Sequence, residues 1–67
     1  MTIFVATIDG RAYGIGWREA EAWQDARARH GWIAHTSRWQ RVTRSVPLAV
    51  AKAIANSDTP PILSEVA

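Results

Sequence analysis

The sequence contains no cysteine, only one lysine, and no apolar run that approaches the roughly 20 residues needed to span a bilayer. Without cysteine there are no disulfide bonds, and two histidines alone argue against a structural zinc site. The first ten residues also lack the basic start and the long apolar core of a signal peptide. We therefore expect a cytoplasmic protein with no membrane contact, no metal and no cofactor.

Motifs that would indicate catalysis are missing as well. There is no cysteine nucleophile, no glycine-x-serine-x-glycine elbow and no phosphate-binding loop. The spacing of Gly10, Gly14 and Gly16 matches part of a dinucleotide-binding fingerprint only superficially, because these glycines fall inside a predicted hairpin. We expect no catalytic residues, and therefore a protein that is not an enzyme.

A chain of 67 residues can form one small domain with a limited core. Domains of this size bury only about 60% of the surface that the unfolded chain exposes, and their cores rarely contribute more than roughly 3–5 kcal/mol. Since disulfides and metals are not expected, aromatic packing and self-association remain as sources of stability. Four tryptophans, one tyrosine and one phenylalanine provide the aromatic area. A homodimer and a monomer both stay open.

Residues 2–17 have the pattern of a β-hairpin. The first half is rich in β-branched and aromatic residues, and Asp9-Gly10 is typical of a two-residue primed turn. Such a turn predicts four facing pairs: Ile8 with Arg11, Ala6 with Tyr13, Phe4 with Ile15, and Thr2 with Trp17. The face of these pairs is bulky, whereas the opposite face is smooth because it carries Gly14 and Gly16. We expect a helix to pack on the smooth face, with a partner or a second protomer as the alternative.

Residues 18–30 predict a helix, with acidic residues in the first turn, basic residues in the last turn and Gly31 after its end. Residues 32–43 alternate in two-residue steps, which predicts a third strand. In that strand His35, Trp39 and Arg41 face outward together, unless a bulge near Arg38 reverses half of it.

A second helix is predicted for residues 45–56, with Ser45 as its cap and an apolar stripe of Pro47, Val50, Ala51 and Ile54. The predicted fold is therefore α+β: hairpin, helix, strand and helix, with the first helix packed on one face of an antiparallel sheet. Residues 1–58 form the single domain, and residues 59–67 form a tail that docks as a short strand or stays mobile. The predicted core contains Phe4, Ile8, Tyr13, Ile15, Trp23, Trp32 and Ile54.

The basic and aromatic residues concentrate between residues 30 and 44, a stretch with three arginines, two histidines, two tryptophans and no acidic residue. Arginine and tryptophan are enriched among the residues that dominate protein interfaces. They also suit nucleic acids, where arginines contact phosphates and tryptophans stack on bases. The candidate partner-binding residues are Arg27, Arg29, His35, Arg38, Trp39, Arg41 and Arg44.

These observations indicate a small binding protein that docks on a macromolecule, with a protein complex favoured over nucleic acid. In size and style the chain resembles the small inhibitors and accessory proteins of phages and mobile elements, including anti-CRISPR and anti-restriction inhibitors, although it carries no motif of any such family. The expected role is that of an inhibitor or adaptor. A nucleic-acid-binding module that uses the arginine- and tryptophan-rich strand is the alternative, disfavoured by a net charge of only +2.

Overall fold

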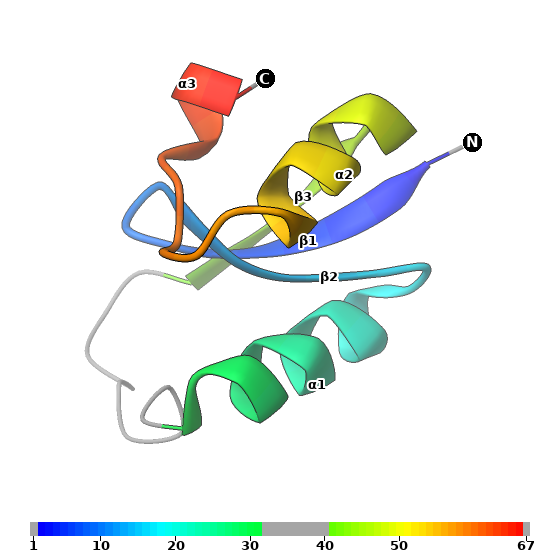
Figure 1. The fold of residues 1–67 in the computed structure, drawn as a ribbon. Helices are drawn as coiled ribbons and strands as arrows, with labels where there is room; N and C mark the ends of the chain where they lie inside the picture. Colours follow the sequence, from blue (N-terminus) through cyan, green and yellow to red (C-terminus); the bar gives the residue numbers. More distant parts are fainter. Residues whose placement is uncertain (1, 32–40, 67) are drawn as a thin grey trace.

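The fold begins with a β-hairpin, shown in blue in the computed structural model, which describes residues 2–31 and 41–66 (Figure 1). Strand β1 (Ile3–Ile8) and strand β2 (Arg11–Gly16) are joined by Asp9-Gly10. Both turn residues have positive φ, 51° at Asp9 and 83° at Gly10. A two-residue turn with positive φ at both positions matches the twist of the flanking strands. The predicted hairpin and its primed turn are confirmed.

The predicted register holds only next to the turn, where Ile8 pairs with Arg11. A β-bulge follows, because Thr7 pairs with Ala12 but Ala6 pairs with Gly14, so that Tyr13 is an extra residue in β2. The predicted pairs Ala6–Tyr13 and Phe4–Ile15 are therefore wrong by one residue, and the predicted pair of Thr2 with Trp17 is lost with them. The bulge also moves the glycines of β2 to the face that carries Tyr13.

Helix α1 (Glu19–Arg29) packs directly on those glycines, and it agrees with the helix predicted for residues 18–30. A Cβ atom built at Gly16 would lie 2.6 Å from the backbone nitrogen of Ala22, and one at Gly14 would lie 2.7 Å from the Cα of Ala26. Ala22 and Ala26 are fully buried. The prediction that a helix packs on the glycines is confirmed. Because the bulge moves the glycines to the other face of the hairpin, however, this helix lies on the face opposite to the predicted one.

Strand β3 (Arg41–Val46) completes an antiparallel sheet in the order β2-β1-β3. It overlaps the predicted third strand only at residues 41–43, since residues 32–40 lie outside the described part. The predicted cap at Ser45 is wrong, because Ser45 pairs with Phe4 inside the sheet. Pro47, which has no backbone N–H for the ladder, follows the strand, and helix α2 (Leu48–Ala55) begins after it.

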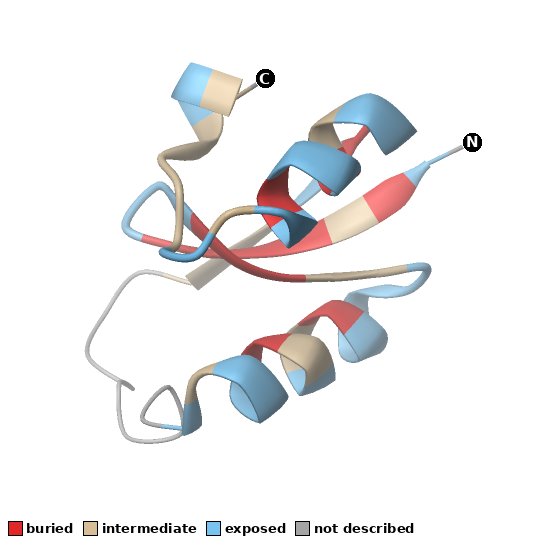
Figure 2. Ribbon diagram, in the orientation of Figure 1, coloured by how far each residue is buried: buried red, intermediate tan, exposed pale blue. Residues whose placement is uncertain are grey.

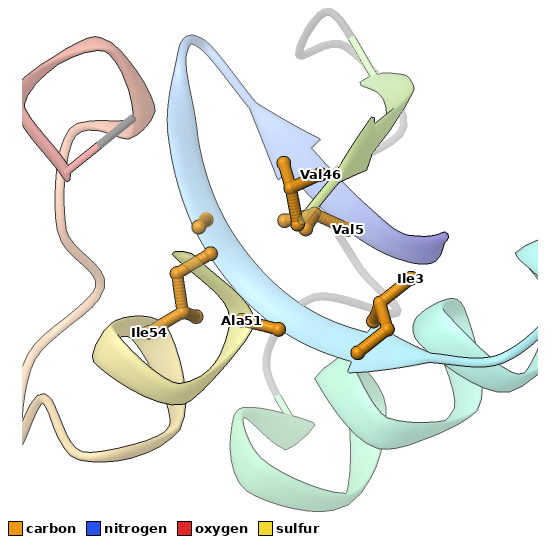
Figure 3. Packing of buried hydrophobic residues seen from close by; sticks show 6 residues of the cluster. Ile3, Val5, Val46, Ala51 and Ile54 are labelled. Atoms are coloured by element: carbon orange, nitrogen blue, oxygen red, sulfur yellow. The ribbon is translucent and has the colours of Figure 1, made fainter. Parts of the chain in front are cut away.

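Helix α2 covers the face of the sheet opposite α1, so the molecule has three layers (Figures 1 and 2). The cluster between α2 and the sheet contains Ile3, Val5, Ala12, Val46, Ala51 and Ile54 (Figure 3). The α+β prediction is thus confirmed, with helices on both faces of the sheet. Of the predicted core, Ile8, Tyr13 and Ile54 are buried, Phe4, Ile15 and Trp23 are partly buried, and Trp32 lies outside the described part.

The carboxy-terminal residues lie against the hairpin turn and end in a short helix, α3 (Leu63–Val66). The Ala12 N–H donates to the Pro61 carbonyl at 2.9 Å, and the Leu63 N–H donates to the Gly10 carbonyl at 2.9 Å. Ile62 forms a bridge with Arg11. The tail is thus docked on the hairpin, but through one bridge and a short helix rather than as the short strand that the sequence suggested.

Candidate functional site

The described residues of the predicted binding site do not share one surface. Arg41 points toward α1, where its guanidinium carbon lies 5.7 Å from the centre of the Trp23 ring. Arg44 is exposed and pairs with Val5, so it lies on the other face of the sheet. The expectation that Arg41 faces outward is wrong, because the side chains of β3 alternate and the Arg41 side packs against a helix. His35, Arg38 and Trp39 lie outside the described residues.

Trp23, in α1, makes two contacts with β3. Its indole Nε1–H donates to the hydroxyl of Thr43 at 2.9 Å, and its ring lies beside the Arg41 guanidinium. Cation–π contacts of this kind stabilise partly buried arginines. The Arg41 side chain is partly buried in this contact. Arg41 therefore holds the helix against the sheet, and it is less available to a partner than the sequence suggested.

Arg27 and Arg29 lie in the last turn of α1, and both are exposed. The Nε of Arg29 lies 3.0 Å from Oδ2 of Asp25, one turn earlier in the helix. The same carboxylate oxygen accepts the backbone N–H of Ile15 at 2.9 Å. Asp25 thus connects α1 to β2 and neutralises one of the two arginines.

A different surface gathers the exposed apolar side chains. Within residues 2–31 and 41–66, the large apolar side chains that stay exposed are Trp17, at 58%, and Leu48, at 41%. Both border one hollow of about 430 Å³ between α2 and the open end of the hairpin, opposite its turn. Its lining, which we call the Trp17–Leu48 groove, consists of Ile3, Ile15, Gly16, Trp17, Glu21, Leu48, Ala51, Lys52 and Ala55.

The groove has an apolar floor and one charge on each side. Ile3 and Ala51 are buried members of the core, so the floor is continuous with the packing under α2. Glu21, from α1, lies beside Trp17 and accepts its backbone N–H at 3.1 Å. Lys52, from α2, lies on the Leu48 side. The groove therefore offers apolar area flanked by an acidic and a basic group.

One signal of this groove was present in the sequence, although the prediction did not use it. Leu48 is a large apolar residue outside the predicted stripe of the second helix, and an apolar residue off the core face is a candidate for contact with a partner. Trp17, in contrast, was expected to face Thr2 across the hairpin. The bulge in β2, which the sequence did not reveal, shifts the register on which that expectation depended.

Two further observations concern a second hollow and the metal-binding potential of the described residues. A second hollow, of about 490 Å³, lies beside the hairpin turn and has Thr7, Asp9 and Arg44 in its lining. Residues 2–31 and 41–66 contain no group of three or more histidine, aspartate or glutamate side chains that could hold a metal ion. None of the helices in these ranges combines the length and apolar character needed to cross a membrane.

Comparison with models of protein families, with curated proteins and with solved structures gives no significant match.

Proposed function

We propose that this protein is a small non-enzymatic binding domain that docks on a partner protein, as an inhibitor or adaptor, and that the Trp17–Leu48 groove is its docking site. The observation that carries the proposal is the position of two large apolar side chains that are exposed, Trp17 and Leu48, on the borders of one apolar groove. Exposed apolar patches next to polar residues mark interaction surfaces. Tryptophan is among the residues that contribute most to binding energy.

The chemistry of the groove favours a protein over a nucleic acid. Its lining contains one acidic and one basic side chain, Glu21 and Lys52, and is otherwise apolar apart from the indole N–H of Trp17. A phosphate backbone requires several cations along its path. A protein side chain such as leucine or phenylalanine requires instead a dry hollow and a polar rim, which these residues supply.

A peptide selection tests this proposal. A displayed library of random peptides is screened for binding to the protein, which is immobilised at low density. We expect the enriched peptides to share one large apolar residue, because such a residue fills the groove. Their binding should be lost in Leu48→Glu, which puts a charge on the groove border. It should be retained in Ala49→Glu, which adds the same charge at the next residue of α2, exposed and outside the groove lining.

The proposal is wrong if no peptide is enriched, or if the enriched peptides bind Leu48→Glu as well as they bind the unmodified protein. Circular dichroism of both variants shows whether the fold is retained, so that loss of binding is not mistaken for unfolding.

A further inference from the structure

We propose that, while no partner protein is bound, the Trp17–Leu48 groove is occupied by a second copy of this chain, related to the first by a two-fold axis that runs along the groove. This inference rests on the proposed function, because the second copy occupies the same groove that the partner protein takes when it binds. Three properties of the groove lead to it: its combination of protruding and recessed parts, the placement of its two charges, and its position beside a strand edge that is already occupied.

The groove carries both elements that a self-complementary interface needs. In a two-fold dimer the same patch meets itself, so each copy must offer protruding side chains and a hollow that receives them. Trp17 and Leu48 protrude into solvent on opposite sides of the hollow. Rotation about an axis along the groove exchanges the two sides, and it brings Trp17 of one copy over Leu48 of the other.

The two charges select this direction of the axis. Glu21 lies on the Trp17 side and Lys52 on the Leu48 side. With the axis along the groove, Glu21 of each copy faces Lys52 of the other, which gives two ion pairs of opposite charge. With the axis across the groove, Glu21 would face Glu21 and Lys52 would face Lys52. Like charges across an interface disfavour the second arrangement strongly.

Pairing of strands is a less suitable route to a dimer on this side of the molecule, because backbone N–H groups on the outer edge of β2 already have acceptors. The N–H groups of Ala12, Ile15 and Trp17 donate to Pro61, Asp25 and Glu21. A second copy on this side therefore meets side chains rather than free backbone groups. Burial of apolar side chains in the groove also adds the stability that a short chain without disulfides lacks.

Sedimentation equilibrium of the purified chain tests the dimer. We expect a monomer–dimer equilibrium in the micromolar range, weakened by about tenfold or more in Glu21→Lys and in Lys52→Glu, because each variant places like charges in contact. An equimolar mixture of the two variants should form a heterodimer, since the new lysine of one variant then meets the new glutamate of the other and the unmodified pair is also restored. Glu19→Lys makes the same charge change at an exposed position outside the groove, and it should dimerise like the unmodified chain.

Trp17→Ala and Leu48→Ala provide a second measurement that does not depend on charge, and both should weaken the dimer. A chain that stays monomeric at all concentrations overturns the inference, and so does a mixture that stays monomeric while each variant is folded. The proposed function is then decided separately by the peptide selection: peptides that bind a monomeric chain through the groove uphold the function and exclude the second copy as its occupant.

Discussion

At positions 14 and 16 the backbone of α1 takes the space that a side chain would need. Gly14 lies against the backbone of Ala22 and Ala26, and Gly16 lies against Ala22 and Glu21. A flexible side chain could move away from an added methyl group, but a helix backbone can do so only if the whole helix shifts. The distance between α1 and the sheet is therefore determined by two missing side chains.

The first prediction concerns Gly14→Ala. The added methyl group forces α1 away from β2, and overpacking of this kind costs about 1–3 kcal/mol. Because the core of a domain of this size rarely contributes more than about 3–5 kcal/mol, we expect the variant to lose a large part of its stability. Urea denaturation followed by circular dichroism measures the loss.

Gly31→Ala is the matched control. Among the described residues, apart from its chain neighbours, no heavy atom lies within 4 Å of the position of a Cβ atom at Gly31, and the residue has no positive φ. This variant should be close to the unmodified chain in stability. Equal stability of the two variants would contradict the close contact between α1 and β2.

Single residues also show where sequence reasoning was limited. Alternation along residues 32–43 predicted a strand, and of these residues the described ones, 41–43, lie in β3. Arg41 was expected to face outward because the side of that strand with Val42 was expected to pack inward. The structure places Arg41 on the face that α1 covers, beside the ring of Trp23. A cation that is stabilised by an aromatic ring from another element cannot be recognised from the pattern of its own strand.

At the scale of elements, the outer edge of β2 is closed by groups from other parts of the chain. Asp25 and Glu21, one turn apart in α1, accept N–H groups of Ile15 and Trp17, and the tail supplies the Pro61 carbonyl for Ala12. Edge strands with free backbone groups pair with other chains and promote aggregation. Helix α1 thus has two roles, since it covers one face of the sheet and also protects its edge.

The second prediction tests this protection through Asp25→Ala. Removal of the carboxylate leaves the Ile15 N–H without its acceptor, so its hydrogen exchange should become faster. Asp25 is partly exposed, and we expect the stability to fall by only about 1 kcal/mol. Amide exchange followed by NMR measures the first effect, and urea denaturation measures the second.

Arg29→Ala separates the hydrogen bond from the ion pair, because it removes the salt bridge to Asp25 and keeps the bond to Ile15. Exposed ion pairs contribute about 0–1 kcal/mol, so this variant should keep the slow exchange at Ile15. Fast exchange at Ile15 in Arg29→Ala would contradict the role given to the carboxylate.

The elements themselves were predictable to different degrees. The turn at Asp9-Gly10 and the helix before Gly31 depend on local residue preferences, and both were predicted correctly. The bulge at Tyr13 was not, because it arises from packing: it brings Gly14 and Gly16 under α1 while Ala12 stays on the face of α2. The end of β3 was missed for a related reason, since Ser45 can cap a helix or extend a strand, and its pairing with β1 decides between the two.

On the scale of the whole molecule, the positive charge is distributed over several surfaces. Arg41 packs against Trp23, Arg44 lies on the opposite face of the sheet, and Arg29 is paired with Asp25. The described residues of the candidate site that the sequence indicated therefore do not form a continuous basic strip. Their three-dimensional placement depends on strand alternation and helix packing, which composition alone does not give.

The third prediction follows from this distribution. We expect fluorescence anisotropy to show no binding of labelled single- or double-stranded DNA or RNA at physiological salt, because phosphate binding requires several cations along one path. Tight binding that weakens by about 0.7–0.9 log units per log unit of salt for each phosphate would contradict this prediction and support the nucleic-acid alternative.

The central position of β1 in the sheet has a consequence for the order in which the molecule can be assembled during synthesis. The first neighbour of β1, together with the helix that covers them both, is complete within residues 3–29. Its second neighbour and the helix over the other face are made only with residues 41–55. A chain emerges from the ribosome with its amino-terminal part first. The side chains of Ile3 and Val5 therefore stay uncovered until α2 has been made, while the opposite face of β1 is already covered by α1.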